Sequence, residues 1–151
     1  MRPGLAVVFA AVFAAFLPAS GIAEDGSNTA APALIRPAGE SDLNEFLWKN
    51  RPIVVFADSA EDPRFQEQLE RLTNGADMLI DRDVVVLTDT DPAARSPVRK
   101  QLRPRGFSLV ILDKDGGVKL RKPSPWSVRE ITRSIDKFPS RQREVEERRG
   151  S

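Results

Sequence analysis

The stretch that decides the fold reads Ile53-Val54-Val55-Phe56-Ala57, and Asp62-Pro63 follows it closely. A continuous apolar run of this length is typical of a β-strand that is covered on both faces. Asp62 is a good helix N-cap, and Pro63 fits the first helical position because no hydrogen bond is lost there. Together the two signals predict a buried strand that leads directly into a helix.

The next residues extend this pattern into a parallel unit. Phe65, Leu69 and Leu72 fall on one face of the predicted helix, and Gly75 ends it. A second buried strand is expected at residues 84–87. Since one helix separates two buried strands, we expect a right-handed β-α-β unit.

The second half of the chain predicts a short helix and a hairpin. Ser96-Pro97 repeats the cap-then-proline signal, and this helix should stop before Pro104. Residues 108–112 (SLVIL) predict a third apolar strand, and residues 113–117 (DKDGG) a turn. Residues 118–121 alternate apolar and charged side chains, which places a fourth strand at a sheet edge.

Helices are expected at both ends of this domain. Ser41 can cap a short helix that ends near Asn50, and Ser124-Pro125 begins a last helix that Pro139 ends. The predicted fold class is therefore α/β. An extra N-terminal helix precedes β-α-β and then α-β-β-α, around a four-stranded mixed sheet.

The chain termini predict export and a tether. Arg2, the apolar run from Leu5 to Leu17 and the small residues up to Ala23 have the layout of a secretory signal peptide. The thirteen apolar residues would cover only ~20 Å of a hydrocarbon core of about 30 Å, so a membrane anchor is the weaker alternative. We expect a signal peptide (1–23), a flexible linker (24–40), a domain (41–139) and a charged tail (140–151) that is either a solvated helix or disordered. The mature protein is then periplasmic or secreted and has no transmembrane span.

The composition excludes several kinds of catalytic and metal-binding chemistry. The 151 residues include no Cys and no His, so the chain has no thiol nucleophile, no disulfide and no imidazole base or ligand. Its 23 basic and 22 acidic side chains give a formal net charge of +1. This balance gives no electrostatic reason to expect nucleic acid as the partner.

Two groups of residues resemble known families. The phrase from Arg105 to Val118 resembles the second half of a thioredoxin core, where a hairpin follows a buried strand. A longer resemblance, over residues 42–144, is to the bacterial exported family known as domain of unknown function 4174. It rests on Trp48-Lys49-Asn50-Arg51-Pro52, Val54-Val55-Phe56-Ala57, Asp62-Pro63-Arg64, Gln68, Arg82-Asp83-Val84-Val85-Val86, the run from Lys114 to Arg121, and Ile135-Asp136. The resemblance implies a thioredoxin-like fold and no assigned activity.

The redox groups of a thioredoxin are missing from this chain. Where thioredoxins carry Cys-x-x-Cys it reads Glu61-Asp62-Pro63-Arg64, and Ser108 stands where they have a cis-proline. Thiol–disulfide exchange and peroxide reduction by thiol peroxidases both need a thiolate, so this chain lacks the reactive group for either.

The first candidate site is the loop before the first predicted core helix, with Asp58, Glu61, Asp62 and Arg64. Capping and solvation explain its carboxylates, because a helix N-terminus stabilises an acid by roughly 0.3–1 kcal/mol. A cation site, a partner site and acid/base catalysis remain as alternatives.

The second candidate site is a basic stretch with Arg95, Arg99, Lys100, Arg103 and Arg105. These side chains form either the solvent-exposed face of a short helix or a patch that binds an anion or an acidic partner. No aromatic residue lies between them, so single-stranded nucleic acid has no stacking platform.

Two further features have competing interpretations. Asp113 and Asp115 hint at a calcium loop, but the remaining ligands of such a loop are missing and a hairpin turn explains them better. Trp48 and Trp126 flank the domain. They either lock terminal helices onto the sheet or, if exposed, indicate a contact surface.

The leading hypothesis is an exported, non-enzymatic domain that binds another exported protein or a cell-envelope component. It uses the loop from Asp58 to Arg64 and Phe107-Ser108, beside the basic helix with Arg99 and Arg103. It assigns no catalytic residue, metal ligand or cofactor. The alternatives are an enzyme that uses Asp58, Glu61 and Asp89, with or without a divalent cation, and a purely structural role.

Overall fold

The computed structural model describes residues 33–151. The predicted signal peptide (1–23) and the first part of the predicted linker (24–32) lie outside the described residues. The strands are β1 (Ile35–Pro37), β2 (Arg51–Phe56), β3 (Val84–Asp89), β4 (Ser108–Leu112) and β5 (Val118–Lys122). The α-helices are α1 (Pro63–Asn74), α2 (Ala76–Ile80), α3 (Pro97–Leu102), α4 (Val128–Ile135) and α5 (Pro139–Arg149), and the 3-10 helices are η1 (Leu43–Phe46) and η2 (Pro92–Ala94).

One mixed sheet organises the described residues, with the strand order β1-β3-β2-β4-β5. β2 and β3 pair in parallel, as the β-α-β prediction requires, while β4 runs antiparallel to both β2 and β5. The predicted count of four strands is wrong, because β1 adds a fifth strand in parallel with β3. The sequence contains little sign of this strand, because Leu34 and Ile35 are the only sizeable apolar residues of the predicted linker. The three residues of β1 nevertheless form a strand, because their backbone pairs with β3, which is already buried.

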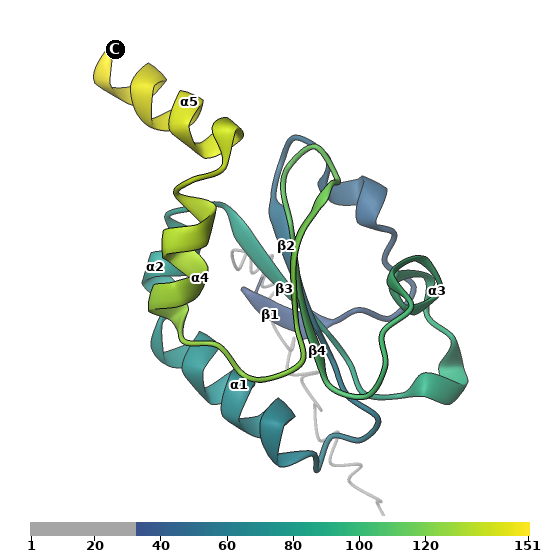
Figure 1. Cartoon of the computed structure of the whole chain (residues 1–151). Coiled ribbons are helices and arrows are strands. Elements are labelled where there is room, and N and C mark those ends of the chain that lie inside the picture. Colours follow the sequence, from purple (N-terminus) through teal and green to yellow (C-terminus); the bar gives the residue numbers. More distant parts are fainter. Residues whose placement is uncertain (1–32) are drawn as a thin grey trace, which may run out of the picture. The chain divides into compact units, whose positions relative to one another are not determined.

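Helices cover both faces of the sheet, with α1, α2 and α4 on one face and α3 on the other (Figure 1). Alternate β2 residues serve the two layers: Ile53 and Val55 belong to one apolar cluster, and Val54 and Phe56 belong to the other. This arrangement explains why the run that decides the fold is apolar at every position.

Several predicted boundaries move because another residue makes the capping contacts. Asp42 rather than Ser41 caps η1, and Ser127 rather than Ser124 caps α4 through a capping box with Glu130. The N-caps predicted at Asp62 and Ser96 are confirmed, since each side chain accepts a backbone hydrogen bond from its helix.

The charged tail forms α5, so its helical alternative is confirmed. Its predicted solvation is wrong at Ser140 and Arg141, which are both buried. β5 lies at the sheet edge as predicted, with mostly exposed side chains. No helix in residues 33–151 has both the length and the hydropathy that a membrane span requires.

The two tryptophans have different environments. Trp126 is half-buried, and its backbone exchanges two hydrogen bonds with the Gln68 side chain, at 2.8 and 2.9 Å. These bonds join the start of α4 to α1, whereas the sequence interpretation expected a contact that locks a terminal helix onto the sheet. Trp48, in contrast, is 69% exposed.

Candidate functional site

The predicted site lies at what we call the loop end of the sheet: residues 58–64 after β2, with Arg99 and residues 103–108. Within it, Asp62 caps α1 and also binds the Arg64 guanidinium through both oxygens, at 3.1 and 2.7 Å. The hydrogen bond from Arg64 outweighs desolvation and lowers the pKa of Asp62. Arg64 in turn lies over the ring of Phe107, 5.6 Å from its centroid.

The other two loop acids are exposed and do not join this ion pair directly. The Ser59 hydroxyl donates to Glu61 and lowers the pKa of that carboxyl. Asp58 is close enough to Arg64 to contribute to raising the pKa of the guanidinium, after the larger effect of Asp62. The structure thus places Asp62 and Asp58 near Arg64, whereas Glu61 bonds to Ser59 instead.

Phe107 and Ser108 are buried, so they form the floor of the site rather than a protruding surface. A hollow of about 250 Å³ opens above them. Its other walls come from Arg103, Pro104, Arg105, Arg121, Lys122 and Pro123.

Arg99 points inward, unlike Arg103. Its guanidinium donates to the carboxylate of Asp89 at 2.9 Å and to the carbonyl of Ala57 at 3.2 Å, and it stacks over Phe56. Burial raises the pKa of Asp89, but the hydrogen bonds from Arg99 and Ser96 outweigh it and lower the pKa below its usual value. Arg99 therefore has a structural role, and Asp89 is already occupied by protein partners.

The structure gives no support to a carboxylate site for a cation. Asp58 and Glu61 lie on the exposed loop, while Asp89 is buried against Arg99. Within residues 33–151, no group of three or more acidic side chains is placed to hold a metal ion.

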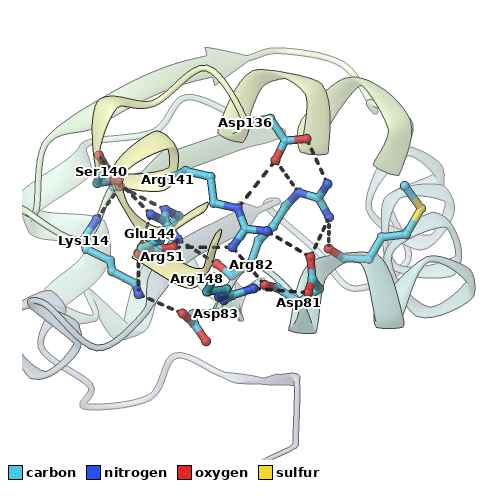
Figure 2. Close-up of polar contacts among 12 residues, drawn as sticks. Arg51, Asp81, Arg82, Asp83, Lys114, Asp136, Ser140, Arg141, Glu144 and Arg148 are labelled. Atoms are coloured by element: carbon cyan, nitrogen blue, oxygen red, sulfur yellow. Dashed lines mark hydrogen bonds and ion pairs between the residues drawn. The ribbon is translucent and has the colours of Figure 1, made fainter. Parts of the chain in front are cut away.

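A second cluster of charges, which sequence reasoning missed, lies at the opposite end of β2 (Figure 2). We call it the α5 end. Its centre is Arg51, which is fully buried and uses all five of its N–H donors. Their acceptors are Asp113 at 3.1 Å, the Arg82 carbonyl at 3.0 Å, Ser140 at 2.8 Å and both oxygens of Glu144 at 2.9 and 3.2 Å.

Ion pairs extend this cluster along α5. Lys114 bridges Asp83 and Glu144, both at 2.8 Å, and Arg141 binds Asp81 at 3.0 Å. Burial raises the pKa of Glu144, but Arg51 and Lys114 outweigh that effect and lower it to about 2. In all, five cations and five carboxylates are joined: Arg51, Arg82, Lys114, Arg141 and Arg148 with Asp81, Asp83, Asp113, Asp136 and Glu144.

The sequence contained one signal for this cluster. Arg51 stands at the start of a strand that is buried along its whole length, so its side chain had to find an acceptor inside the protein or leave the sheet. The acceptors could not be named from the sequence, because Asp113 is 62 residues away and Glu144 is 93 residues away.

Residues 42–144 match the family described as Domain of unknown function (DUF4174). The chain belongs to this family. Every predicted site residue lies inside the matched range, as do Arg51, Asp113 and Glu144. The DUF4174 description assigns no activity.

A curated relative and two solved structures are similar to this DUF4174 chain. Coiled-coil domain-containing protein 80 of Danio rerio is 29% identical, over 70% of this chain and only 16% of its own length. The reduced 2-Cys peroxiredoxin of Plasmodium vivax aligns with a TM-score of 0.51 and 18% identity, over 64% of this chain and 81% of that one. Prx1a of Plasmodium yoelii gives a TM-score of 0.50 and 19% identity, over 65% and 78%.

These structural likenesses confirm the thioredoxin-like fold, and at such identity they show the fold alone. The chain spans about a sixth of the length of the curated relative. Thiol chemistry remains excluded by composition, because the sequence contains no Cys.

Proposed function

We propose that this DUF4174 domain is an exported, non-catalytic binding module. It takes an acidic segment of another exported protein or of a cell-envelope component at the loop end of the sheet. One observation supports this choice of partner: the hollow above Phe107 and Ser108 has four cationic side chains among its walls and no acidic one among the described residues that line it.

The charges around this hollow favour an acidic ligand over a basic one. Arg103 and Arg105 are exposed, and no hydrogen bond or ion pair engages their side chains within residues 33–151. Two of the three loop acids already have partners, since Asp62 is paired with Arg64 and Glu61 accepts from Ser59. Asp58, near Gly106, is then a single acid against the four cations of the hollow. An incoming carboxylate therefore meets unpaired cations, which both attract and orient it.

A labelled decaglutamate peptide tests the site directly. We expect a saturable rise in fluorescence anisotropy at low salt, weakened about tenfold in an Arg103→Ala/Arg105→Ala variant and lost as salt rises. The matched control is Arg129→Ala/Arg133→Ala, which removes the same charge from exposed positions of α4. Equal loss in both variants would contradict a specific site and leave only general attraction of a polyanion.

A pull-down from periplasmic extract tests the loop itself. The variant Glu61→Ala/Arg64→Ala removes one acid and one base, so the net charge does not change. We expect it to lose a partner that the unmodified domain captures. Unchanged capture by the variant would remove this loop from the proposed surface.

Export is the part of the proposal that rests on residues 1–23 alone. If the apolar leader directs secretion, cells that express the full chain should release a shortened protein that begins at Glu24. Intact-mass measurement of the released protein checks the cleavage. Recovery of the protein only in full length, inside the cell, would overturn the localisation.

A further inference from the structure

Trp48 is an exposed aromatic residue in an unfavourable backbone conformation. Its side chain is 69% exposed, and its φ angle is 62°, in the left-handed region that bulky side chains rarely adopt. The conformation is fixed because the Trp48 amide donates to the carbonyl of Lys114 at 2.8 Å. The turn between β4 and β5 packs against the same segment, since a Cβ added at Gly116 would come within 2.9 Å of Leu47.

Folding gains little from this indole. A side chain that stays mostly in water contributes little hydrophobic stabilisation, and the left-handed backbone opposes folding. Trp126 shows the contrasting case, because it is half-buried and its backbone is hydrogen bonded to Gln68. Because the fold makes so little use of the Trp48 ring, the ring is available for a contact outside the domain.

Two hollows lie beside Trp48, and the cluster around Arg51 holds part of their polar walls. Each has a volume of about 200 Å³, and both share Trp48, Ser140 and Arg143 as walls. Ser140 also belongs to the cluster around Arg51, as do Lys114 and Glu144 in the first hollow, and Figure 2 shows these side chains gathered beside Arg51. The contacts that hold α5 therefore also fix the surface that flanks the indole.

The exposed charged groups around the ring include both donors and acceptors, and of these the Asp115 carboxylate also accepts from the Gly117 amide at 2.8 Å. Arg143 and Lys119 are exposed cations, and Glu147 and Asp115 are exposed carboxylates. Within residues 33–151, no ion pair engages any of these four side chains. This balance of charge does not favour a strongly anionic or cationic ligand, whereas a ligand rich in hydroxyl groups can both donate to and accept from such walls.

We propose that Trp48 is the stacking platform of a saccharide-binding site. The apolar C–H face of a sugar ring lies on the indole, and its hydroxyl groups extend into the two flanking hollows. Each hollow is smaller than the roughly 300 Å³ at which pockets for drug-sized ligands begin, so it accommodates a single ring of a neutral glycan chain. The geometry does not favour insertion into a membrane, because polar walls flank the indole on both sides.

The test uses the full DUF4174 domain with chitohexaose, cellohexaose and maltohexaose as probes. A Trp126→Phe background makes Trp48 the only tryptophan, so its emission reports contact with the sugar. We expect a saturable change with at least one probe, and a similar affinity by calorimetry with the unmodified domain. Trp48→Ala should weaken binding at least about tenfold, and Arg143→Ala should weaken it several-fold.

A Trp48→Gly variant separates binding from folding. Glycine adopts positive φ freely, so this variant should melt at the same temperature or higher while it loses the sugar. Saturable binding of none of the three probes, or binding that Trp48→Ala retains, would overturn the proposal. Binding to phosphatidylglycerol vesicles that depends on Trp48, without sugar binding, would also overturn it and identify a membrane contact instead.

This site is independent of the acidic-segment site at the loop end. β2 separates the two, because Trp48 precedes its first residue and Asp58 follows its last. Arg103→Ala/Arg105→Ala should leave sugar binding unchanged, and Trp48→Ala should leave decaglutamate binding unchanged. If each variant instead weakened both ligands equally, the saccharide site would not exist as a separate site.

Discussion

The two ends of β2 use the same kinds of charged side chain in different ways. At the loop end, charges pair with near neighbours in the sequence, as Asp62 does with Arg64, and the Arg64 side chain is about half exposed. At the α5 end, the guanidinium of Arg51 is fully buried and binds residues that are distant in the sequence, such as Glu144, 93 residues away. The first arrangement leaves charge available to a ligand, whereas the second joins distant parts of the chain.

This contrast indicates where the charges stabilise the fold. An exposed ion pair contributes about 0.2–1 kcal/mol, whereas removing one partner of a buried pair costs about 3–5 kcal/mol because the other charge remains buried and unpaired. Substitutions at the α5 end should therefore affect stability far more than equivalent substitutions at the loop end.

Removing the Arg51 guanidinium should have the largest effect. Arg51→Met leaves Asp113 and Glu144 without their central cation, so we expect the free energy of unfolding to fall by about 3–5 kcal/mol. Urea unfolding followed by circular dichroism measures it. Arg64→Met is the matched control at the loop end and should change stability only slightly, because its ion pair is exposed to solvent. Equal effects of the two substitutions would show that the buried cluster around Arg51 stabilises the fold no more than the exposed ion pair of Arg64 does.

Acid should weaken the ion pairs that attach α5 to the sheet, over a defined pH range. The pKa of Glu144 is about 2 in the folded protein, below its ordinary value of 4.5, so its contribution is fully present above pH 4.5 and is lost as the pH falls toward 2. At about 1.4 kcal/mol per pKa unit, this contribution is on the order of 3 kcal/mol.

The Glu144→Gln variant isolates that contribution from the other acids. The difference in unfolding free energy between the unmodified protein and this variant should be constant from pH 7 to about pH 5 and then shrink. Urea titrations at several pH values measure the difference. A difference that stays constant down to pH 2 would show that Glu144 is not the responsible group.

A hydroxyl group holds α5 at its first turn. Ser140 accepts from Arg51 at 2.8 Å and donates to Asp113 at 2.7 Å, and all three residues are buried. Ser140→Ala should therefore lower stability by about 1–3 kcal/mol. Ser134→Ala on α4, whose hydroxyl donates only to a carbonyl of its own helix, should change it much less. A small effect of Ser140→Ala would indicate that water replaces the hydroxyl.

Removing the cap of α1 should have the smallest effect of the four. Asp62→Ala removes both an N-cap hydrogen bond and an exposed ion pair, so we expect urea unfolding to show a smaller loss of stability than Ser140→Ala. Asp58→Ala, in the same loop, should be nearly neutral. A loss at Asp62 as large as that at Arg51 would show that the loop end is also essential to the fold.

The sequence was sufficient for the elements whose signals are local. Apolar runs located β2, β3 and β4, and Asp62 and Ser96 located the starts of α1 and α3. The prediction that Asp58, Glu61 and Asp62 lie around the N-terminus of one helix also rested on a local signal, because they are close in the chain and precede α1.

The features that the sequence could not provide depend on distant partners. β1 has only three residues and exists because β3 offers it an edge. α5 contains little apolar surface, and its attachment depends on Arg51 and Asp113, which belong to other parts of the sheet. The exposure of Trp48 likewise follows from a backbone conformation that the β4–β5 turn imposes.

The edge strand β5 has a consequence for how the protein behaves at high concentration. Its free edge exposes unpaired backbone groups that could template strand addition by another molecule. Lys119, Arg121 and Lys122 place three positive charges within its five residues. Repulsion between the cations of two copies opposes pairing of their β5 edges, so these side chains protect the edge against fibrous aggregation.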